Sequence, residues 1–416
     1  MTANKLHSTA DSPDVIVIGG GPVGSYAALS LAKTDAKVTV FEEHSAIGVP
    51  SHCAGHISIR SLRAMGLYPL PKGIIENFFN AANFYSPTGT KFSLKLSSPV
   101  TVALNRALFD QFLAKQAEAA GASFRLNSRV QSLITQDGSI KGVKVQKDNG
   151  DTQAVYAKLV VDAEGISSRF LRQAGLTALK SQGLVYAVEA EVDQARNVED
   201  HAVEVYLGKA YASGFYAWLI PRLDGTAKVG LATNTGNPRE LLQRLMTKHP
   251  AASKQLAKSK ITKISFHAIT LGGPIAKAYS NGFLAVGDVA SQVKPTTGGG
   301  VIFGLTCANI AAEVAGAAIA KGDVSSDFLA LYQKRCNEAL SFDVGVMLKL
   351  RRFLDSLSDE KLDDVLRFCT RLGVDKALRD VEEIDFQGRM MLKVLGKPAM
   401  LAAAAYFLLL YLSANP

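Results

Sequence analysis

One glycine-rich turn constrains this chain more than any other feature. It lies in DVIVIGGGPVGSYAALSLAK, where an apolar β-branched run is followed by glycines and then by small residues typical of a closely packed helix. Gly19, Gly21 and Gly24 satisfy the spacing G-x-G-x-x-G, with Val23 inside the loop. Such glycines permit a tight turn and a close backbone approach to a pyrophosphate, which N–H groups at the helix N-terminus can bind. The pattern predicts a strand–turn–helix unit that binds a dinucleotide.

A second strand is predicted in KVTVFEE, and it ends at Glu42, eighteen residues after Gly24. A carboxylate at this distance can hold the 2′-hydroxyl of a ribose. These two features fit NAD and FAD equally well, so the choice between them depends on segments farther along the chain.

Two of those segments lie in the first half of the chain. LNRALFDQFLAKQAEAAGA predicts a helix with Arg106 near its first turn, followed by a strand that we expect to end at Val130. LVVDAEGISSRFLRQAG predicts an apolar strand that runs into Asp162, followed by Glu164 and Gly165 and then by a basic helix. Arg106 is either a cofactor contact or half of an ordinary salt bridge on the helix surface.

The third segment is NGFLAVGDVASQVKPTTGGGVIFG, which predicts a strand ending at Asp288, a loop and a helix. A run of three glycines, Gly298, Gly299 and Gly300, stands immediately before the helix, which begins near Val301. A helix N-terminus presents free N–H groups and a partial positive charge, and both favour an anion placed against it.

Taken in this order, the three segments resemble the flavoprotein superfamily of p-hydroxybenzoate hydroxylase. The resemblance implies FAD as the cofactor, with Arg106 and Val130 near it and Asp288 on the ribityl chain. It also implies that the glycines before Val301 place the helix N-terminus under the flavin pyrimidine. The chain departs from the family pattern at Glu164, where an aspartate is usual, and Glu164 is therefore not assigned to the site.

Two shorter stretches resemble one branch of that superfamily, the geranylgeranyl reductases of archaeal type. GVPSHCAGHIS contains the C-x-G segment Cys53, Ala54 and Gly55. GFYAWLIPRLDGTAKVGLA resembles the Y-x-W-x-F-P motif and its downstream glycine, with Ile220 in place of Phe and Ala232 where a second glycine would stand. The resemblance implies a substrate tunnel for prenyl chains, walled by the following residues of the motif: Tyr216, Trp218, Pro221 and Gly230. Without the resemblance, ordinary core packing is the favoured interpretation of the two aromatic residues.

Cys53 lies between His52 and His56, which raises three alternatives for this stretch. A zinc site needs three or four ligands, and no second Cys/His pair at zinc spacing occurs in the chain. A nucleophile needs a positioned base, and none is evident nearby. The resemblance places the C-x-G loop against the flavin, and an ordinary thiol keeps its proton near neutrality. Cys53 is therefore the candidate proton donor, or else it only shapes the loop, while the histidines are expected to be solvent-facing or to form hydrogen bonds in the loop.

Net charge and hydropathy indicate whether the protein binds nucleic acid or a membrane. The chain has 416 residues, a formal net charge of +9 and 48% hydrophobic residues, but no dense basic run with interleaved aromatics that would indicate nucleic acid. The apolar tail PAMLAAAAYFLLLYL, residues 398–412, is shorter than the roughly 20 residues of a transmembrane helix. It is predicted to be either a buried terminal helix or a contact with a membrane surface. Cations precede it at Lys349, Arg351, Arg352, Arg389, Lys393 and Lys397.

These observations predict an α/β fold with a Rossmann-like, doubly wound FAD-binding domain, an inserted antiparallel substrate sheet and a helical C-terminal region. The expected bounds are a disordered lead at 1–12, the FAD domain at 13–175 with 276–325, the sheet at 176–275 and the helices at 326–416. Four scattered cysteines and a polar N-terminus without an apolar signal region indicate a reducing, cytoplasmic setting.

The predicted function is FAD-dependent saturation of geranylgeranyl chains on archaeal-type glycerophospholipids at the inner face of the cell membrane. Electrons would come from a reduced ferredoxin-like protein or from NAD(P)H. The alternatives are a reductase of geranylgeranyl diphosphate or of the chlorophyll tail, an FAD-dependent aromatic monooxygenase, and a prenyl-lipid carrier without catalysis.

Overall fold

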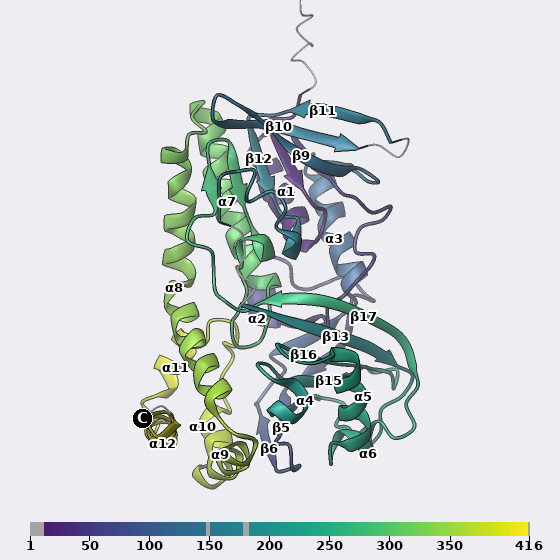
Figure 1. Cartoon of the computed structure of the whole chain (residues 1–416), viewed down its shortest axis with the longest axis vertical. Coiled ribbons are helices and arrows are strands. Elements are labelled where there is room, and N and C mark those ends of the chain that lie inside the picture. The colour runs from purple at the N-terminus through teal and green to yellow at the C-terminus, as the bar shows by residue number, and fades with distance from the viewer. Residues whose placement is uncertain (1–11, 147–149, 178–182, 415–416) are drawn as a thin grey trace, which may run out of the picture.

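The computed structural model describes residues 12–146, 150–177 and 183–414, so nearly all of the predicted disordered lead lies outside the described residues. A six-stranded sheet forms the upper half of the molecule (Figure 1). All of its neighbouring strands run parallel except the edge pair β18 and β19. In spatial order the strands are β18 (Tyr279–Ser280), β19 (Phe283–Ala285), β12 (Leu159–Asp162), β1 (Val15–Ile18), β2 (Val38–Phe41) and β8 (Ser123–Arg125).

Helices and a small sheet cover these strands. Helix α1 (Pro22–Ala32) packs against both α3 (Arg106–Ala119) and α7 (Val301–Lys321). A three-stranded antiparallel sheet packs on β12; its strands are β9 (Arg129–Gln136), β10 (Ser139–Gln146) and β11 (Thr152–Tyr156). Helix α7 is long and apolar enough to span a membrane, but most of it is buried between its neighbours. The predicted strand end at Val130 is wrong, because β8 ends at Arg125 and Val130 is the second residue of β9.

A seven-stranded sheet forms the second layer. It is antiparallel throughout except where β14 pairs with β5 in parallel. Its strands, in spatial order, are β17 (Ile261–Thr270), β13 (Leu184–Val192), β16 (Ala227–Thr233), β15 (Ala217–Pro221), β14 (Ala202–Tyr206), β5 (Ala81–Tyr85) and β6 (Lys91–Lys95). The expected domain bounds therefore need a correction: β5 and β6 come from the segment assigned to the FAD domain. β5 pairs with the edge of β14, and β6 pairs with β5 to complete the sheet.

Alternation along these strands separates two apolar faces. Val188, Ala190 and Leu219 belong to a core that also contains residues of α5 (Pro238–Lys248) and α6 (Ala252–Gln255). Residues on the other face, such as Ala187 and Trp218, pack with Ala54 of the C-x-G segment. A period of two residues is what a sheet buried on both sides requires. The face that carries Trp218 is therefore turned toward the cofactor loops.

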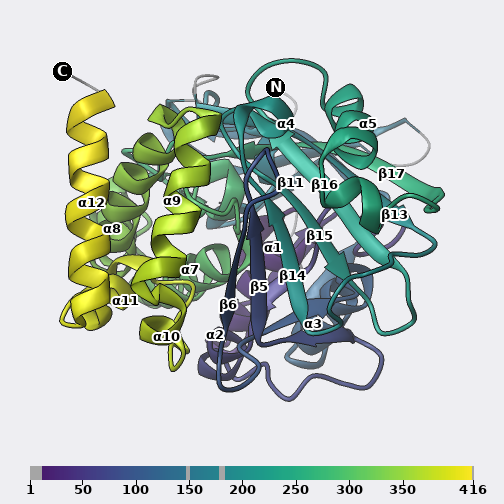
Figure 2. The same cartoon turned by 90° about the horizontal axis from the view of Figure 1, so that it is seen from below.

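The C-terminal region consists of helices, as expected. Helix α8 (Ser326–Ser356) runs along one side of the molecule, and α9 (Asp359–Leu372), α10 (Val374–Leu378), α11 (Gln387–Val394) and α12 (Pro398–Ala414) follow it. Seen from below, α12 is the outermost helix, on the far side of α8 and α9 from the seven-stranded sheet (Figure 2). The remaining elements are β3 (His56–Ser58), α2 (Ile59–Ala64), β4 (Ile75–Phe79), β7 (Thr101–Leu104), α4 (Lys209–Ala212) and two 3-10 turns, Gly165–Ser167 and Gly287–Ala290.

Candidate active site

The glycine-rich loop lets β1 and α1 approach each other closely. A β-carbon on Gly24 would lie 2.0 Å from the carbonyl oxygen of Gly19, and one on Gly19 would lie 2.6 Å from that of Ala163. Gly19 also has a φ of +94°, which favours glycine. A β-carbon on Gly21, by contrast, would meet nothing within 4 Å. Gly19 and Gly24 thus allow β1 and α1 to pack closely where they cross, whereas Gly21 faces open space.

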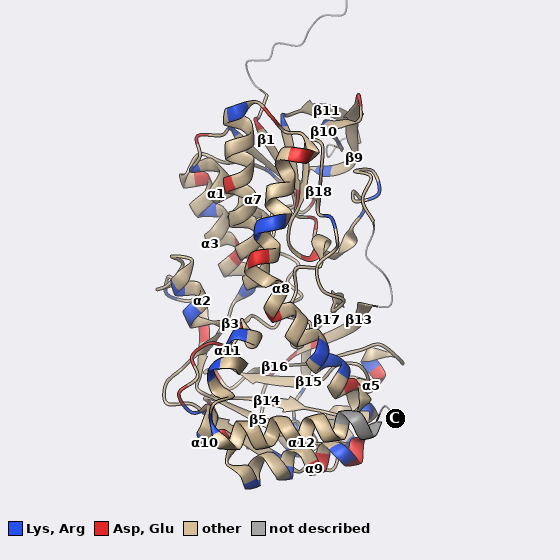
Figure 3. Cartoon of the chain, turned by 90° about the vertical axis from the view of Figure 1, so that its left-hand side faces the viewer, with Lys and Arg blue, Asp and Glu red and all other residues tan. Residues whose placement is uncertain are grey.

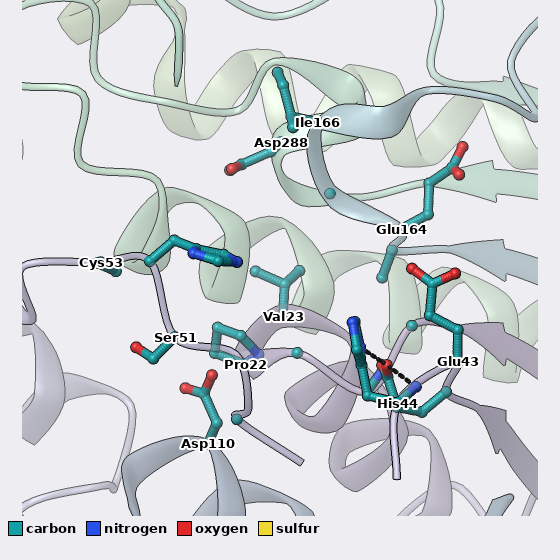
Figure 4. A pocket seen from close by; sticks show the side chains of 18 of the residues that line it. Pro22, Val23, Glu43, His44, Ser51, Cys53, Asp110, Glu164, Ile166 and Asp288 are labelled. Atoms are coloured by element: carbon teal, nitrogen blue, oxygen red, sulfur yellow. Dashed lines mark hydrogen bonds and ion pairs between the residues drawn. The ribbon is translucent and has the colours of Figure 1, made fainter. Parts of the chain in front are cut away.

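That open space is a cavity of about 410 Å³ beside the glycine loop. Asp288 and Val23 face it, with Cys53 toward one end and His44 toward the other (Figure 4). The residues predicted from the sequence that line it are Gly19, Gly21, Val23, Glu42, Cys53, Arg106, Val130, Asp288, Gly298, Gly300 and Val301. Residues from distant parts of the chain thus meet around one cavity.

The Glu42 carboxylate holds the glycine loop from the end of β2. One of its oxygens accepts a hydrogen bond from the backbone N–H of Gly20 at 2.7 Å. The other accepts one from the backbone N–H of His44 at 2.9 Å and contacts the His44 ring at 2.5 Å. Glu42 therefore shapes the loop and also lines the cavity, and its contact with a ribose stays a prediction.

Arg106 opens α3 directly after Asn105, whose side chain caps the helix by accepting the N–H of Leu108. Its guanidinium lies 3.0 Å from Asp110, and both side chains are buried. Burial acts to lower the pKa of Arg106, but Asp110 and then Cys53 outweigh it and raise the pKa above its ordinary value. Arg106 is thus buried, paired with Asp110 and next to Cys53, unlike a residue in a surface salt bridge.

Asp288 ends the strand–turn segment on the opposite side of the cavity. Burial raises its pKa, and Arg106 acts against that rise. A β-carbon on Gly300 would lie 2.6 Å from an Asp288 oxygen, so the glycine permits this approach. Gly300 is also the residue from which α7 begins, which places the helix N-terminus at the cavity.

The C-x-G loop turns sharply at Gly55. The φ of Gly55 is +75°, and a β-carbon there would lie 2.3 Å from the carbonyl oxygen of Leu104. The Gly55 N–H donates to the sulfur of Cys53 at 3.5 Å. Of the four free cysteines Cys53 is the one that is not buried. The loop therefore presents its thiol to the cavity instead of burying it.

The two histidines beside Cys53 have separate surroundings. The ring of His56 contacts the Thr101 hydroxyl at 2.6 Å and packs edge-on against Phe79. His56 and His52 are both exposed to solvent. The ring of His52 stacks on that of His267, with 6.4 Å between the ring centres. Among the described residues, no group of three or more His, Cys, Asp or Glu is arranged to hold a metal ion.

Of the predicted substrate residues, Trp218 and Gly230 lie on the sheet face that is turned toward these loops, whereas Pro221 alternates with Leu219 onto the opposite face. The Tyr216 hydroxyl donates to the carbonyl of Thr297 at 2.9 Å, so it contacts the loop before the three glycines. Trp218 pairs across the strands with Gly230, where a β-carbon would lie 2.5 Å from the indole. Pro221 ends β15 and accepts a hydrogen bond from Asn77. Tyr216 thus lies next to the cofactor loop, whereas Pro221 lies farther along the strand.

The remaining predicted cofactor residues lie next to the cavity without lining it. Gly24, Ala54, Gly55 and Gly299 do not line the cavity, although Val23, Cys53, Gly298 and Gly300 beside them do. Several residues that line the cavity belong to no sequence motif that would have predicted them: His44, Asp110, Ile166, His267 and Ile269. His267 and Ile269 reach the cavity from β17, and an isolated histidine in a strand pattern indicates no particular function.

The residues present fit a bound FAD. The cavity is lined both by the glycine loop at Gly21 and by the start of α7 at Val301, the two segments predicted to contact the pyrophosphate and the flavin. Two buried polar atoms of cavity-side segments, Nδ1 of His267 and the hydroxyl of Thr297, have no hydrogen-bond partner within the described part of the chain. Buried polar atoms are usually paired, so these two are available to a ligand.

Comparisons with known proteins agree with this fit. A family described as FAD binding domain matches residues 12–341. The chain is 35% identical over 364 residues to digeranylgeranylglycerophospholipid reductase 2 of Methanothermobacter thermautotrophicus, covering 85% of this chain and 91% of that one. It is 30% identical over 401 residues to the protein of the same name from Methanopyrus kandleri, covering 95% and 99%. A solved geranylgeranyl bacteriochlorophyll reductase-like protein of Thermoplasma acidophilum superposes with a TM-score of 0.84 at 26% identity, over 95% and 99% of the two chains.

Two glycine substitutions should separate folding from cofactor binding. Gly24→Ala places a β-carbon against the Gly19 carbonyl, so both the free energy of unfolding and the FAD content should fall. Overpacking of this kind costs about 1–3 kcal/mol. Gly21→Ala meets no protein atom, so its apoprotein should unfold as the parent does, while its FAD dissociation constant rises at least tenfold. Denaturant unfolding and flavin titration measure the two effects, and parental FAD affinity in Gly21→Ala would contradict the placement of the cofactor.

Proposed function

The chain belongs to the family of digeranylgeranylglycerophospholipid reductases and has its FAD-binding domain, and we propose that it saturates geranylgeranyl chains carried on a glycerophospholipid. The relatives that match almost the whole chain carry this activity in their names. The observation that carries the proposal is the position of two segments: Cys53 of the C-x-G loop lines the cofactor cavity, and the Tyr216 hydroxyl contacts the loop that leads to the three glycines.

The reaction needs a hydride at one alkene carbon and a proton at the other. FAD, when bound and reduced, supplies the hydride. An isolated trisubstituted alkene has no carbonyl to accept electron density, so positive charge develops at the tertiary carbon as the proton arrives. Tyr216 and Trp218 are in ring contact with each other, and their faces can stabilise such a charge by about 1–2 kcal/mol when desolvated.

Cys53 is proposed to hold that proton. Its thiol lies on the loop at the cavity, and Arg106 is close enough to interact with it. A neighbouring guanidinium stabilises the thiolate that remains after the proton has left. Asp110 neutralises Arg106 from the other side at 3.0 Å, so the cation is oriented toward the thiol without an uncompensated charge.

We further propose that the protein works in the cytoplasm, at the inner face of the cell membrane, and receives electrons from a reduced ferredoxin-like protein or from NAD(P)H. Helix α12 supports the membrane contact because its two sides differ. Ala403 and Tyr406 pack with Phe353 and other residues of α8 and α9. The opposite side exposes Leu401, Leu408 and Leu409 by 55%, 58% and 66%. No charged residue interrupts this helix (Figure 3).

The proposed activity is tested with the full-length FAD-loaded protein. Dithionite-reduced protein, mixed without oxygen with a digeranylgeranyl glycerophospholipid, should reoxidise and yield a lipid that is two hydrogens heavier for each double bond reduced. Mass spectrometry of the lipid measures this. Dithionite makes the assay independent of the natural donor. An added oxygen atom under air would indicate a monooxygenase, and bound but unchanged lipid would indicate a carrier; either result would refute the proposal.

Cys53→Ser and Cys53→Ala should slow lipid-dependent flavin oxidation by 10²–10⁴-fold, the usual contribution of a general acid. Stopped-flow absorbance of a single turnover measures this rate. FAD content should stay parental, because small residues replace the thiol. Cys369→Ala, which removes a buried thiol in α9, is the matched control and should react at the parental rate. If both Cys53 variants also react at that rate, Cys53 is not the donor.

Replacing Leu401, Leu408 and Leu409 together with Gln should reduce binding to anionic phospholipid vesicles at least tenfold, since burying one leucine contributes about 1.5–3 kcal/mol. Co-flotation with vesicles measures the bound fraction. The control is Leu331→Gln, at an exposed leucine of α8 that is not part of α12. Parental binding by the triple variant would exclude α12 as the contact.

A further inference from the structure

Lys228 is a buried lysine on the sheet face that is turned toward the cofactor loops. It lies in β16, paired with Ile220 of β15 and Glu191 of β13. Two residues farther along β16 is Gly230, on which the indole of Trp218 lies. The register therefore places Lys228 next to the proposed substrate aromatics and on the same side of the sheet.

The ammonium group of Lys228 reaches into the C-x-G loop. It donates to the carbonyl oxygen of Ala54 at 3.2 Å and to that of Leu104 at 3.4 Å. Leu104 in turn donates its N–H to the carbonyl of Gly55 at 2.9 Å. The third neighbour of the ammonium is a Glu76 oxygen at 3.5 Å. One side chain thus joins the centre of the sheet, the C-x-G loop and β7.

A charge buried at this position has a cost that a hydrophobic residue would avoid. Removing an ammonium from water is unfavourable unless its three donors find partners, and an apolar side chain of similar length would pack without this requirement. All three partners of Lys228 come from other elements, and two of them are backbone carbonyls. This arrangement fixes positions that side-chain packing alone would leave adjustable.

The carboxylates near Lys228 have other partners or are themselves buried, so they do not draw its ammonium group away from the C-x-G loop. Glu76 also pairs with Arg222 at 3.2 Å, and Arg222 pairs with Glu191 at 2.9 Å. Glu189 faces the same region, and burial raises its pKa although Lys228 acts to lower it. The indole N–H of Trp218 is close enough to lower the pKa of Glu189 as well, but it makes no hydrogen bond of ordinary geometry.

We propose that Lys228 is a positioning residue, which holds the Cys53–Gly55 loop so that the thiol of Cys53 faces the cavity at a fixed place. This inference rests on the proposed function for the role of Cys53, but the position of the loop can be measured without any lipid. The thiol of Cys53 touches the cavity; Lys228 acts on it only through the carbonyl of Ala54 and the neighbouring strand.

Alkylation of Cys53 provides that measurement. Because the other three cysteines are buried, iodoacetamide should react first with Cys53, and peptide mass spectrometry can follow this site in FAD-loaded protein. Lys228→Met should raise the alkylation rate at least fivefold, because the loop loses its anchor. Lys228→Arg, which keeps a cation that can donate to carbonyls, should restore most of the protection. Lys263→Met is the matched control on β17, which is separated from β16 by β13: Lys263 is 54% exposed and lies 3.6 Å from Glu191.

The lipid assay adds a second readout. Lys228→Met should lower kcat at least tenfold with little change in KM, because the substrate still binds while the thiol is misplaced. Parental alkylation in Lys228→Met would overturn the proposal, whatever happens to kcat. If Lys228→Met does not fold, Lys228→Gln keeps neutral donors and is expected to show the same faster alkylation. If the parent reduces no lipid, the proposed function fails, while the alkylation rates still decide the role of Lys228.

Discussion

The guanidinium of Arg351 binds the loop at Pro295 and Thr296, where the two sheets and the C-terminal helices come together. From α8 it donates to the carbonyls of Pro295, Thr296 and Gly214, and it lies over the ring of Phe215. Arginine suits this place because its planar group carries five donors in a fixed arrangement. Pro295 and Thr296 lead directly to the three glycines and the N-terminus of α7. The Tyr216 hydroxyl, which donates to the Thr297 carbonyl at 2.9 Å, makes a second link between the sheet and the same loop.

A buried ion pair closes the same loop from its other side. Lys294 lies 2.5 Å from Asp385, which also accepts a hydrogen bond from Ser61 at 2.5 Å. Burial acts to raise the pKa of Asp385, but Lys294 and Ser61 outweigh it, so the pKa lies below its ordinary value. Buried pairs add little net stability compared with apolar packing, but breaking one leaves a costly unpaired charge. The pair therefore specifies where the C-terminal segment sits more than it stabilises the fold. That segment continues into α11 and α12, so the helix proposed to meet the membrane follows directly from a residue bound to the cofactor loop.

The parts of the site that could be predicted are those whose physical requirement is local. The crossing of β1 and α1 needs glycine at fixed spacing, and Asp288 lies in the turn just after β19, so both are visible in a single stretch of sequence. The predicted strand end at Asp288 is wrong, because β19 ends at Ala285 and Asp288 belongs to the 3-10 turn Gly287–Ala290. Lys228 and His267 could not be found this way, because their roles arise from the register of a sheet whose strands are far apart in the chain. The joining of β5 and β6 to that sheet is equally non-local, since a strand pattern does not reveal its partner. Arg351 shows the reverse error: it was grouped with cations near a membrane, yet its side chain is buried on backbone carbonyls.

The electrostatics of the site are consistent with the proposed chemistry. Three cations lie in this region, the buried Arg106 and Lys228 and the half-buried Lys294, and each has a carboxylate partner: Arg106 with Asp110 at 3.0 Å, Lys228 with Glu76 at 3.5 Å and Lys294 with Asp385 at 2.5 Å. An unpaired cation beside an apolar pocket would oppose the positive charge that develops when an alkene is protonated, and weak dielectric screening would make that opposition large. A paired cation can still hold a loop or a thiol in position through its hydrogen bonds. The negative charge of its carboxylate partner meanwhile cancels most of its electrostatic effect on the substrate. The uncharged rings of Tyr216 and Trp218, which contact each other, are the groups proposed to stabilise the positive charge on the substrate.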